Sequence, residues 1–376
     1  MSSALFSSMT LRGLTLPNRI VVSPMCQYSA VDGSATDWHL MHLGKFAVSG
    51  AGLVIIEATH VEARGRITHG CLGLYSDDNE RQLARVVDFC HNAGRARIGM
   101  QMSHSGRKGS ARLPWIGRGE PLPAGEEPWE TIAPSALPHG PGWPAPRELD
   151  AEGLAAAKDA HVEATRRAAR IGIDLIELHI AHGYLLHEFL SPLSNTRTDA
   201  YGGAIENRMR YPLEVFAAMR AVWPADRPMG VRHSVTDWAE GGWTPADAEV
   251  FAAKLKDLGC DYITATTGGL SVDQKIPIGE GHQVEFARRL REKAGLPTMA
   301  VGMIFDPHHA EQIIRDGDAD FVALARGMLS DPHWPWRAAS ALDADVSYPA
   351  QYVRGYKSSW LRSLRGDGRS AALSSS

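Results

Sequence analysis

Eight short runs rich in β-branched and other apolar residues recur along the chain, separated by segments with helical periodicity. The runs cover residues 19–25, 52–61, 96–104, 173–180, 229–235, 261–268, 298–304 and 320–327. The helical segments include 77–94, 153–172, 244–259 and 306–317, and three of these open with Asp or Thr and close with Gly. Strands that alternate with helices predict a parallel sheet of the α/β class. Eight such units in 376 residues predict a single (β/α)8 TIM barrel.

An open doubly wound sheet is the alternative fold, and it favours a Gly-rich nucleotide turn that this sequence lacks, since it contains no G-x-G-x-x-G. Residues 106–149, rich in Pro, Gly and Trp, interrupt the alternation as a long excursion after the third strand. A connection of this length is either a functional segment, here a wall or cover of a pocket, or a surface excursion. Residues 1–356 are predicted to form one barrel domain, and 357–376 a partly flexible C-terminal extension.

Charge and cysteine content argue against several kinds of partner and of metal site. Lys and Arg number 39 and Asp and Glu 43, giving a net charge of −4 without a basic run, so nucleic acid and anionic membranes are poor partners. The N-terminus lacks the apolar centre of a signal peptide, and no apolar run approaches the roughly 20 residues of a membrane span, so we expect a cytoplasmic protein. The four cysteines form no C-x-x-C pair, which removes the ligands of a zinc or iron–sulfur site.

The C-terminal ends of barrel strands converge on one site, so the residues there are the candidates for function. Glycines end the last two strands, in the place where many barrels bind phosphate. The strand-end candidates are Ser23, Pro24, Met25, Cys26, Tyr28, Ala58, Gln101, His179, His182, Tyr184, Arg232, Gly302, Met303, Ala325 and Arg326.

The sequence HIAHGY, residues 179–184, places two histidines and a tyrosine at one strand end. A metal site would need more ligands, typically carboxylates at other strand ends, and Schiff-base chemistry would need a lysine at a strand end. A metal site is therefore disfavoured, and no lysine stands at a strand end. A purely structural role fits poorly, because the chain leaves its apolar strand at Ile180. Two neutral imidazole N–H groups can stabilise charge on one oxygen, and a tyrosine beside them can donate a proton. The set suits a polarised carbonyl compound, yet it contains no reductant.

Several long segments, in the same order along the chain, resemble the old yellow enzyme family of FMN-dependent ene reductases. That resemblance supplies the missing reductant. HIAHGYLLHEFLSPLSNTRTDAYGGAIENR (179–208) resembles the signature region of that family. LPNRIVVSPMCQYSA (16–30), with Cys26 and Tyr28, resembles the first strand of the thermophilic-like subgroup, which is similar to the xenobiotic reductases. QMSHSGRKG (101–109), ETIAPSA (130–136), AVGMI (300–304) and ARGMLSDP (325–332) match as well.

The resemblance implies an FMN across the barrel mouth. Ser23, Pro24, Met25, Cys26 and Ala58 would line one edge of the flavin, Gln101 would bond its pyrimidine ring, and Arg232 would lie by N1 and the C2 carbonyl. Gly302, Met303, Ala325 and Arg326 would hold the phosphate. Cys26 would tune the redox behaviour of the cofactor rather than attack a substrate.

The resemblance also implies a ping-pong oxidoreductase that uses NADPH or NADH. His179 and His182, with Tyr28, would hold the carbonyl oxygen of a small electrophilic alkene such as an enone or a quinone, and Tyr184 would protonate the α-carbon. Arg354, in a Q-Y-x-R-G motif, would reach the site of a neighbouring subunit in a homodimer or homotetramer, although twenty more residues, including Trp360 and Arg362, follow Tyr356. The competing hypotheses are a flavin-free barrel isomerase or lyase acting on a phosphorylated substrate, and a flavin-binding scaffold without activity.

Overall fold

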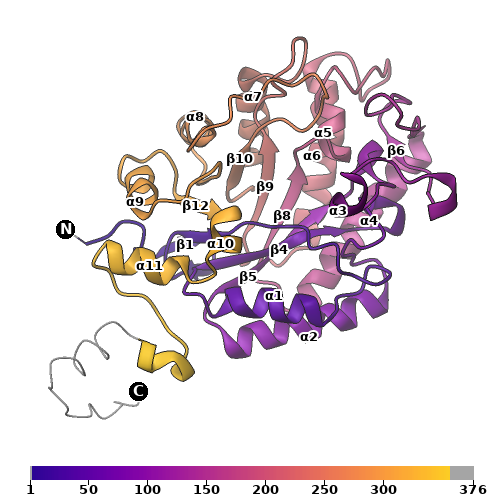
Figure 1. The fold of residues 1–376 in the computed structure, drawn as a ribbon. Helices are drawn as coiled ribbons and strands as arrows, with labels where there is room; N and C mark the ends of the chain where they lie inside the picture. Colours follow the sequence, from indigo (N-terminus) through magenta and orange to yellow (C-terminus); the bar gives the residue numbers. More distant parts are fainter. Residues whose placement is uncertain (1, 356–376) are drawn as a thin grey trace, which may run out of the picture.

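Eight parallel strands close into a barrel at the centre of the computed structural model, which describes residues 2–355 (Figure 1). Each strand pairs with the next along the chain, and the last pairs with the first, so the predicted (β/α)8 barrel is confirmed. The barrel strands are β3 (Ile20–Val22), β4 (Leu53–His60), β5 (Arg97–Ser103), β8 (Leu175–Ile180), β9 (Met229–Ser234), β10 (Ile263–Thr266), β11 (Thr298–Ala300) and β12 (Phe321–Leu324).

Helices follow the strands and form the outer ring. They are α1 (Asp37–Ala47), α2 (Asp77–Ala93), α4 (Ala151–Arg170), α5 (Leu185–Leu190), α6 (Ile205–Val222), α7 (Pro245–Asp257), α8 (Val284–Ala294), α9 (Pro307–Arg315), α10 (Arg326–Ser330) and α11 (Trp334–Ala341). The polar residues that mark helix starts in the sequence act as N-caps: the side chains of Thr244 and Asp306 each accept a backbone N–H from the first turn of α7 and α9.

Two apolar layers hold the barrel. One lies between the strands and the outer helices, and the other fills the barrel interior. A hairpin of β1 (Met9–Leu11) and β2 (Leu14–Leu16) packs Leu11, Leu14 and Leu16 into this interior cluster together with Val21 and Leu53. The hairpin therefore covers the base of the barrel and leaves the other end, where the strands terminate, for the site. The sequence did not predict it, because three-residue strands are too short to show a periodicity.

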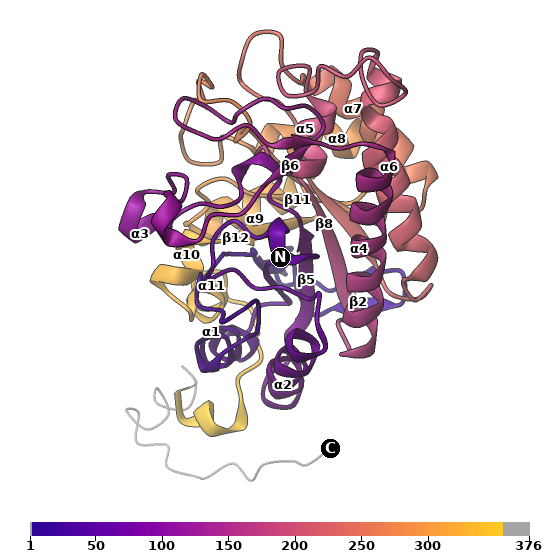
Figure 2. The same ribbon diagram turned by 90° about the vertical axis from the view of Figure 1, so that its right-hand side faces the viewer.

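The excursion after β5 is folded against the barrel. It contains α3 (Pro114–Gly117) and the paired strands β6 (Ile132–Ala133) and β7 (Arg147–Glu148). The backbone N–H of Ala111 donates to the carbonyl of Ile67 at 2.8 Å, and Trp129 Nε1 donates to the carbonyl of Arg64 at 2.9 Å, so the excursion rests on the loop that follows β4. Figure 2 shows β6 beside α5, at the end of the barrel where the strands terminate.

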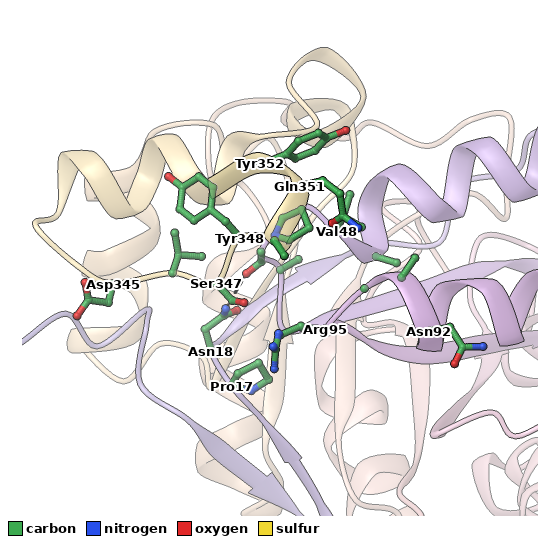
Figure 3. A pocket seen from close by; sticks show the side chains of 18 of the residues that line it. Pro17, Asn18, Val48, Asn92, Arg95, Asp345, Ser347, Tyr348, Gln351 and Tyr352 are labelled. Carbon is green, nitrogen blue, oxygen red and sulfur yellow. Dashed lines mark hydrogen bonds between the residues drawn. The ribbon is translucent and has the colours of Figure 1, made fainter. Parts of the chain in front are cut away.

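The last described segment lies at the opposite end. There a hollow of about 680 Å³ separates residues 345–352 from the N-terminal ends of the strands (Figure 3). Tyr348, Gln351 and Tyr352 line it on one side, and Asn18 and Arg95 line it on the other. The predicted extension, 357–376, lies outside the described residues. Within residues 2–355, no helix combines the length and apolar character needed to cross a membrane.

Candidate active site

The two histidines and the tyrosine of HIAHGY meet at the mouth of the barrel. His179 is the penultimate residue of β8 and lies opposite Arg232 of β9, and the chain then turns through His182 and Gly183, whose φ values are +59° and +73°. Positive φ is unfavourable for a residue with a side chain, so His182 keeps it only because its surroundings enforce it. The ring centroid of His179 lies 5.2 Å from that of His182 and 5.0 Å from that of Tyr184. The structure therefore brings these three predicted residues together.

Hydrogen bonds fix the backbone of this turn. The N–H of His182 donates to Ser234 Oγ at 3.0 Å, and the N–H of Gly183 donates to His187 Nδ1 at 2.9 Å. Lys108 Nζ donates to the carbonyls of His182 and Gly269, both at 2.8 Å. Three further segments thus fix the backbone from which the His182 side chain projects.

Sequence reasoning missed Lys108 and His187 as functional residues. Lys108 lies in the segment QMSHSGRKG that carried the resemblance, so the signal was present but was not interpreted. Its ammonium also lies 5.2 Å from the ring centre of Tyr184. Burial lowers the pKa of Lys108 to about 8, with Glu188 acting to raise it and Arg107 to lower it.

The charge states at the mouth follow from burial. Burial lowers the pKa of His179 and of His182 well below the usual value for histidine, and the cation of Arg232 lowers both further. Both imidazoles are therefore neutral at physiological pH. Burial raises the pKa of Tyr184 and of Tyr28, so both hydroxyls keep their protons. The mouth presents neutral donors, which suits an oxygen that gains negative charge.

One wall of the mouth is apolar. Tyr28, Tyr184 and Cys26 pack against a small buried cluster that includes Ala111, and Trp143 packs there too. Because Ala111 and Trp143 belong to the excursion, that segment forms a wall of the mouth. Burial, together with the nearby carboxylate of Glu57, raises the pKa of the Cys26 thiol well above its usual value. A neutral thiol is a poor nucleophile, which agrees with a tuning role for Cys26.

Two ionisable side chains, Glu177 and Arg232, lie in the barrel beneath the mouth, and neighbouring residues satisfy only part of their hydrogen-bonding capacity. Gln101 Nε2 donates to Glu177 Oε1 at 2.8 Å, and Thr264 donates to the other oxygen of that carboxylate. Arg232 lies two residues further along in the register and forms no ion pair with a described carboxylate, and its buried Nε lacks a hydrogen-bond partner among the described residues. A buried polar group in this state is suited to a ligand. The arrangement fits an anionic ring system above Arg232 and Gln101.

The remaining predicted cofactor residues lie at neighbouring strand ends. Ser23, Pro24 and Met25 follow β3, while Ala58 lies in the irregular part of β4 where the register shifts between Ile56 and Thr59.

The predicted phosphate residues occupy two adjacent strands, because β11 pairs with β12. Gly302 and Met303 leave β11 with φ values of +111° and +54°, and Ala325 and Arg326 begin α10 directly after β12. A Cβ at Gly302 would approach Gln283 Nε2 to 3.1 Å, so the glycine leaves room beside that amide. Glycine and backbone N–H groups at the ends of the last two strands fit a phosphate.

Arg354 lies away from the mouth of its own chain. It is exposed and belongs to a short 3-10 helix, Ala350–Gly355. Tyr352, two residues earlier, lines the hollow at the barrel base that Figure 3 shows. Within one chain, Arg354 is thus separated from the other predicted site residues, and contact with a substrate would require a second copy of the protein.

Comparisons with known proteins agree on one family. Residues 4–345 match the model of the NADH:flavin oxidoreductase / NADH oxidase family. An NADPH dehydrogenase of Geobacillus thermodenitrificans is 41% identical over 359 residues, which cover 95% of this chain and 100% of that protein. The NADPH dehydrogenase of Bacillus subtilis is 39% identical over 358 residues, with 95% and 100% covered.

Solved structures give the same result. Morphinone reductase superposes with a TM-score of 0.76 at 29% identity, covering 93% of this chain and 92% of its own. A structure of morphinone reductase in complex with tetrahydroNAD superposes with a TM-score of 0.74 at 28% identity, with 92% of each chain covered.

Proposed function

Since the chain belongs to the NADH:flavin oxidoreductase / NADH oxidase family, that of the old yellow enzymes, and is an FMN-dependent NAD(P)H oxidoreductase, we propose that it reduces the C=C bond of α,β-unsaturated carbonyl compounds. The observation that carries this proposal is the convergence of His179, His182 and Tyr184 at the mouth of the barrel. Enones are the proposed substrate class, and quinones and other electrophilic xenobiotics are related candidates.

The cofactor would lie across the strand ends. When bound and reduced by NAD(P)H, FMN would supply the hydride for the β-carbon of the substrate. Gln101 and Arg232 would contact its pyrimidine side, and the cation of Arg232 favours negative charge there. Ser23, Pro24, Met25, Cys26 and Ala58 would line an edge of the ring, and Gly302, Met303, Ala325 and Arg326 would hold the phosphate.

The histidines would bind the carbonyl oxygen of the substrate. The ring of His179 is buried, that of His182 is partly buried, and both are neutral, so each can present one N–H without the cost of a buried cation. As negative charge moves onto the oxygen during reduction, donors that already point at the bound oxygen would stabilise that charge more than they stabilise the ground state. The hydroxyl of Tyr28, on the apolar wall, is a third candidate donor.

Tyr184 would protonate the α-carbon. Burial raises its pKa, so the hydroxyl is protonated over the whole physiological range and can act as a general acid. Its ring packs edge-on against His179, at a centroid distance of 5.0 Å and an interplanar angle of 84°. The proton donor therefore lies beside the group that binds the oxygen.

Nicotinamide and alkene would occupy the same mouth in turn, which gives a ping-pong reaction. We also propose that the enzyme works in the cytoplasm, which the four unpaired cysteines favour, and that it forms a homodimer or homotetramer in which Arg354 contacts a neighbouring site. The flavin-free isomerase or lyase hypothesis is set aside, because the family uses FMN.

Anaerobic turnover tests the proposal. Purified holoenzyme should oxidise NADPH or NADH in the presence of 2-cyclohexen-1-one and release an equal amount of cyclohexanone, measured by gas chromatography. Cyclohexanone serves as the control substrate, because it keeps the carbonyl group and lacks the C=C bond. Oxidation of nicotinamide that is no faster with the enone than with cyclohexanone would contradict the proposed activity.

A further inference from the structure

His182 touches hydrogen-bonding groups on both edges of its ring. Its Nδ1 lies 3.4 Å from His179 Nε2, and its Nε2 lies 3.0 Å from Thr266 Oγ1. The hydroxyl of Thr266 in turn lies 2.9 Å from Gln283 Oε1. An unbroken chain therefore runs from His179 through His182 and Thr266 to Gln283, and its last two members have no role in the reaction described above.

The number of protons in this chain limits what His182 can do. A neutral imidazole carries one N–H, and the Thr266 hydroxyl carries one hydrogen. If that hydrogen points to Gln283, the Nε2–H of His182 must donate to Thr266, and Nδ1 is a bare lone pair. If it points to Nε2, the ring proton is on Nδ1, facing His179 and the substrate oxygen.

The amide of Gln283 selects between these two states. In the structure Oε1 accepts from Thr266 at 2.9 Å and from Thr267 at 3.3 Å, and this direction of donation leaves His182 Nδ1 without a proton. Half a turn of the amide would exchange oxygen for nitrogen, because the two ends have nearly the same shape. Nε2 would then donate to Thr266, whose hydrogen would turn to His182 Nε2.

The surroundings of Gln283 link this change to the cofactor site. Gln283 Nε2 lies beside Gly302, where an added Cβ would approach it to 3.1 Å. The amide thus spans the distance between Thr266 and a residue assigned to phosphate binding. The neutral state of His182, a consequence of burial, makes the position of its single proton decisive.

We propose that Thr266 and Gln283 are positioning residues that set the tautomer of His182. In the resting protein each hydrogen bond of the chain is donated away from the substrate. His179 Nε2 donates to His182 Nδ1, His182 Nε2 donates to Thr266 Oγ1, and the Thr266 hydroxyl donates to Gln283 Oε1. When a substrate oxygen binds, the chain reverses, and His182 donates from Nδ1. The role of this chain in turnover rests on the proposed function, whereas the direction of its hydrogen bonds in the resting protein does not depend on that function.

Nitrogen-15 NMR of histidine-labelled holoenzyme tests the proposal, because the two neutral tautomers give different ring ¹⁵N shifts. His182→Asn identifies the signals of His182. The resting wild type should show the Nε2–H tautomer, and saturation with 4-cyanophenolate, an anionic mimic of the charged substrate oxygen, should convert it to Nδ1–H. An Nδ1–H tautomer in the free wild type, or no change with the phenolate, would overturn the proposal.

Two variants of Gln283 should act in opposite directions. Gln283→Glu only accepts, so it should lock the Nε2–H tautomer and weaken 4-cyanophenolate binding about tenfold or more, the loss expected for one charge-assisted hydrogen bond. Gln283→Met frees the Thr266 hydroxyl, so it should give Nδ1–H without a ligand. Equal tautomers in the two variants would overturn the proposal, because a merely structural role would not separate them.

Thr267→Val is the matched control, since Thr267 also bonds Gln283 but not His182. It should keep the wild-type tautomer and a phenolate affinity within about twofold. A protein that shows the predicted tautomers but reduces no enone would refute the proposed function and leave the relay intact. An active enzyme whose tautomer ignores Gln283 would refute the relay alone.

Discussion

Replacing Asp237 by Asn should destabilise the protein and loosen the turn that carries His182. Asp237 and His187 are both fully buried, and His187 Nε2 lies 3.0 Å from Asp237 Oδ1. The other oxygen of Asp237 accepts from Ser191 Oγ at 2.6 Å and from the N–H of Trp243 at 2.7 Å. Burial alone would raise the pKa of Asp237, but His187 and these hydrogen bonds outweigh it and lower that pKa, so the group is a carboxylate.

The magnitude follows from counting donors. Gly183 donates to His187 Nδ1, so the ring proton of His187 lies on Nε2 and faces Asp237. The oxygen of an asparagine can accept from Ser191 and Trp243, but its NH₂ then faces the N–H of His187. If the ring proton moved to Nδ1, it would face the N–H of Gly183, so two donors would still oppose each other. Replacing the carboxylate oxygen that faces the buried N–H of His187 by a second donor costs about 1–3 kcal/mol, and loss of the charge weakens the bonds from Ser191 and Trp243, so we expect about 3 kcal/mol.

Urea unfolding of the holoenzyme followed by circular dichroism measures this loss. The control is Asp316→Asn, at an exposed carboxylate that bonds Gln312, which should change stability by about 0.5 kcal/mol or less. Because His187 holds the N–H of Gly183, Asp237→Asn should also weaken 4-cyanophenolate binding. If Asp237→Asn and Asp316→Asn destabilise the protein equally, the reasoning about this buried pair is wrong.

Five further substitutions test the site. Tyr184→Phe should slow flavin reoxidation by an enone about 10²-fold or more and flavin reduction by NADPH much less, by stopped-flow absorbance; equal slowing would remove Tyr184 as the proton donor. His179→Ala and His182→Ala should each weaken 4-cyanophenolate binding about tenfold by spectral titration, whereas unchanged affinity would rule out the paired donors. Burial raises the pKa of Glu188 to about 8, above the roughly 4.3 of an unfolded chain. The folded state therefore holds a proton that the unfolded state has lost, and stability falls as pH rises between those values. Glu188→Gln should flatten that decline in urea unfolding at pH 5–8, and a decline parallel to the wild type would contradict the assignment. Lys108→Met removes two hydrogen bonds, to the carbonyls of His182 and Gly269, and should weaken 4-cyanophenolate binding several-fold; wild-type affinity would show that Lys108 does not position His182.

The barrel could be predicted because its strands are buried on both faces. All eight residues of β4 and all six of β8 are buried, and such strands appear in a sequence as continuous apolar runs. The position of His179 then followed from the rule that the strand ends of a barrel converge. The resemblance added FMN and the division of roles, which residue types alone could not supply.

What could not be predicted depends on contacts between distant segments. Gln283 reaches the site only because the loop after β10 folds back onto Thr266, and Lys108 only because it crosses to His182 and Gly269. Nothing in the local sequence of Gln283 distinguishes it from a surface glutamine. His187 and Asp237 are fifty residues apart, and their pairing appears only once β8 and β9 lie side by side.

Anaerobic stopped-flow reoxidation of the reduced holoenzyme by 2-cyclohexen-1-one tests most directly whether two imidazoles activate the conjugated carbonyl. The comparison is between the wild type and the variant that carries both His179→Ala and His182→Ala, at saturating enone. Removal of one donor from such a site typically costs about 10²–10³ in rate, so the double variant should reoxidise at least about 10²-fold more slowly. Reduction of its flavin by NADPH should change far less. Reoxidation of the double variant at the wild-type rate would contradict the account.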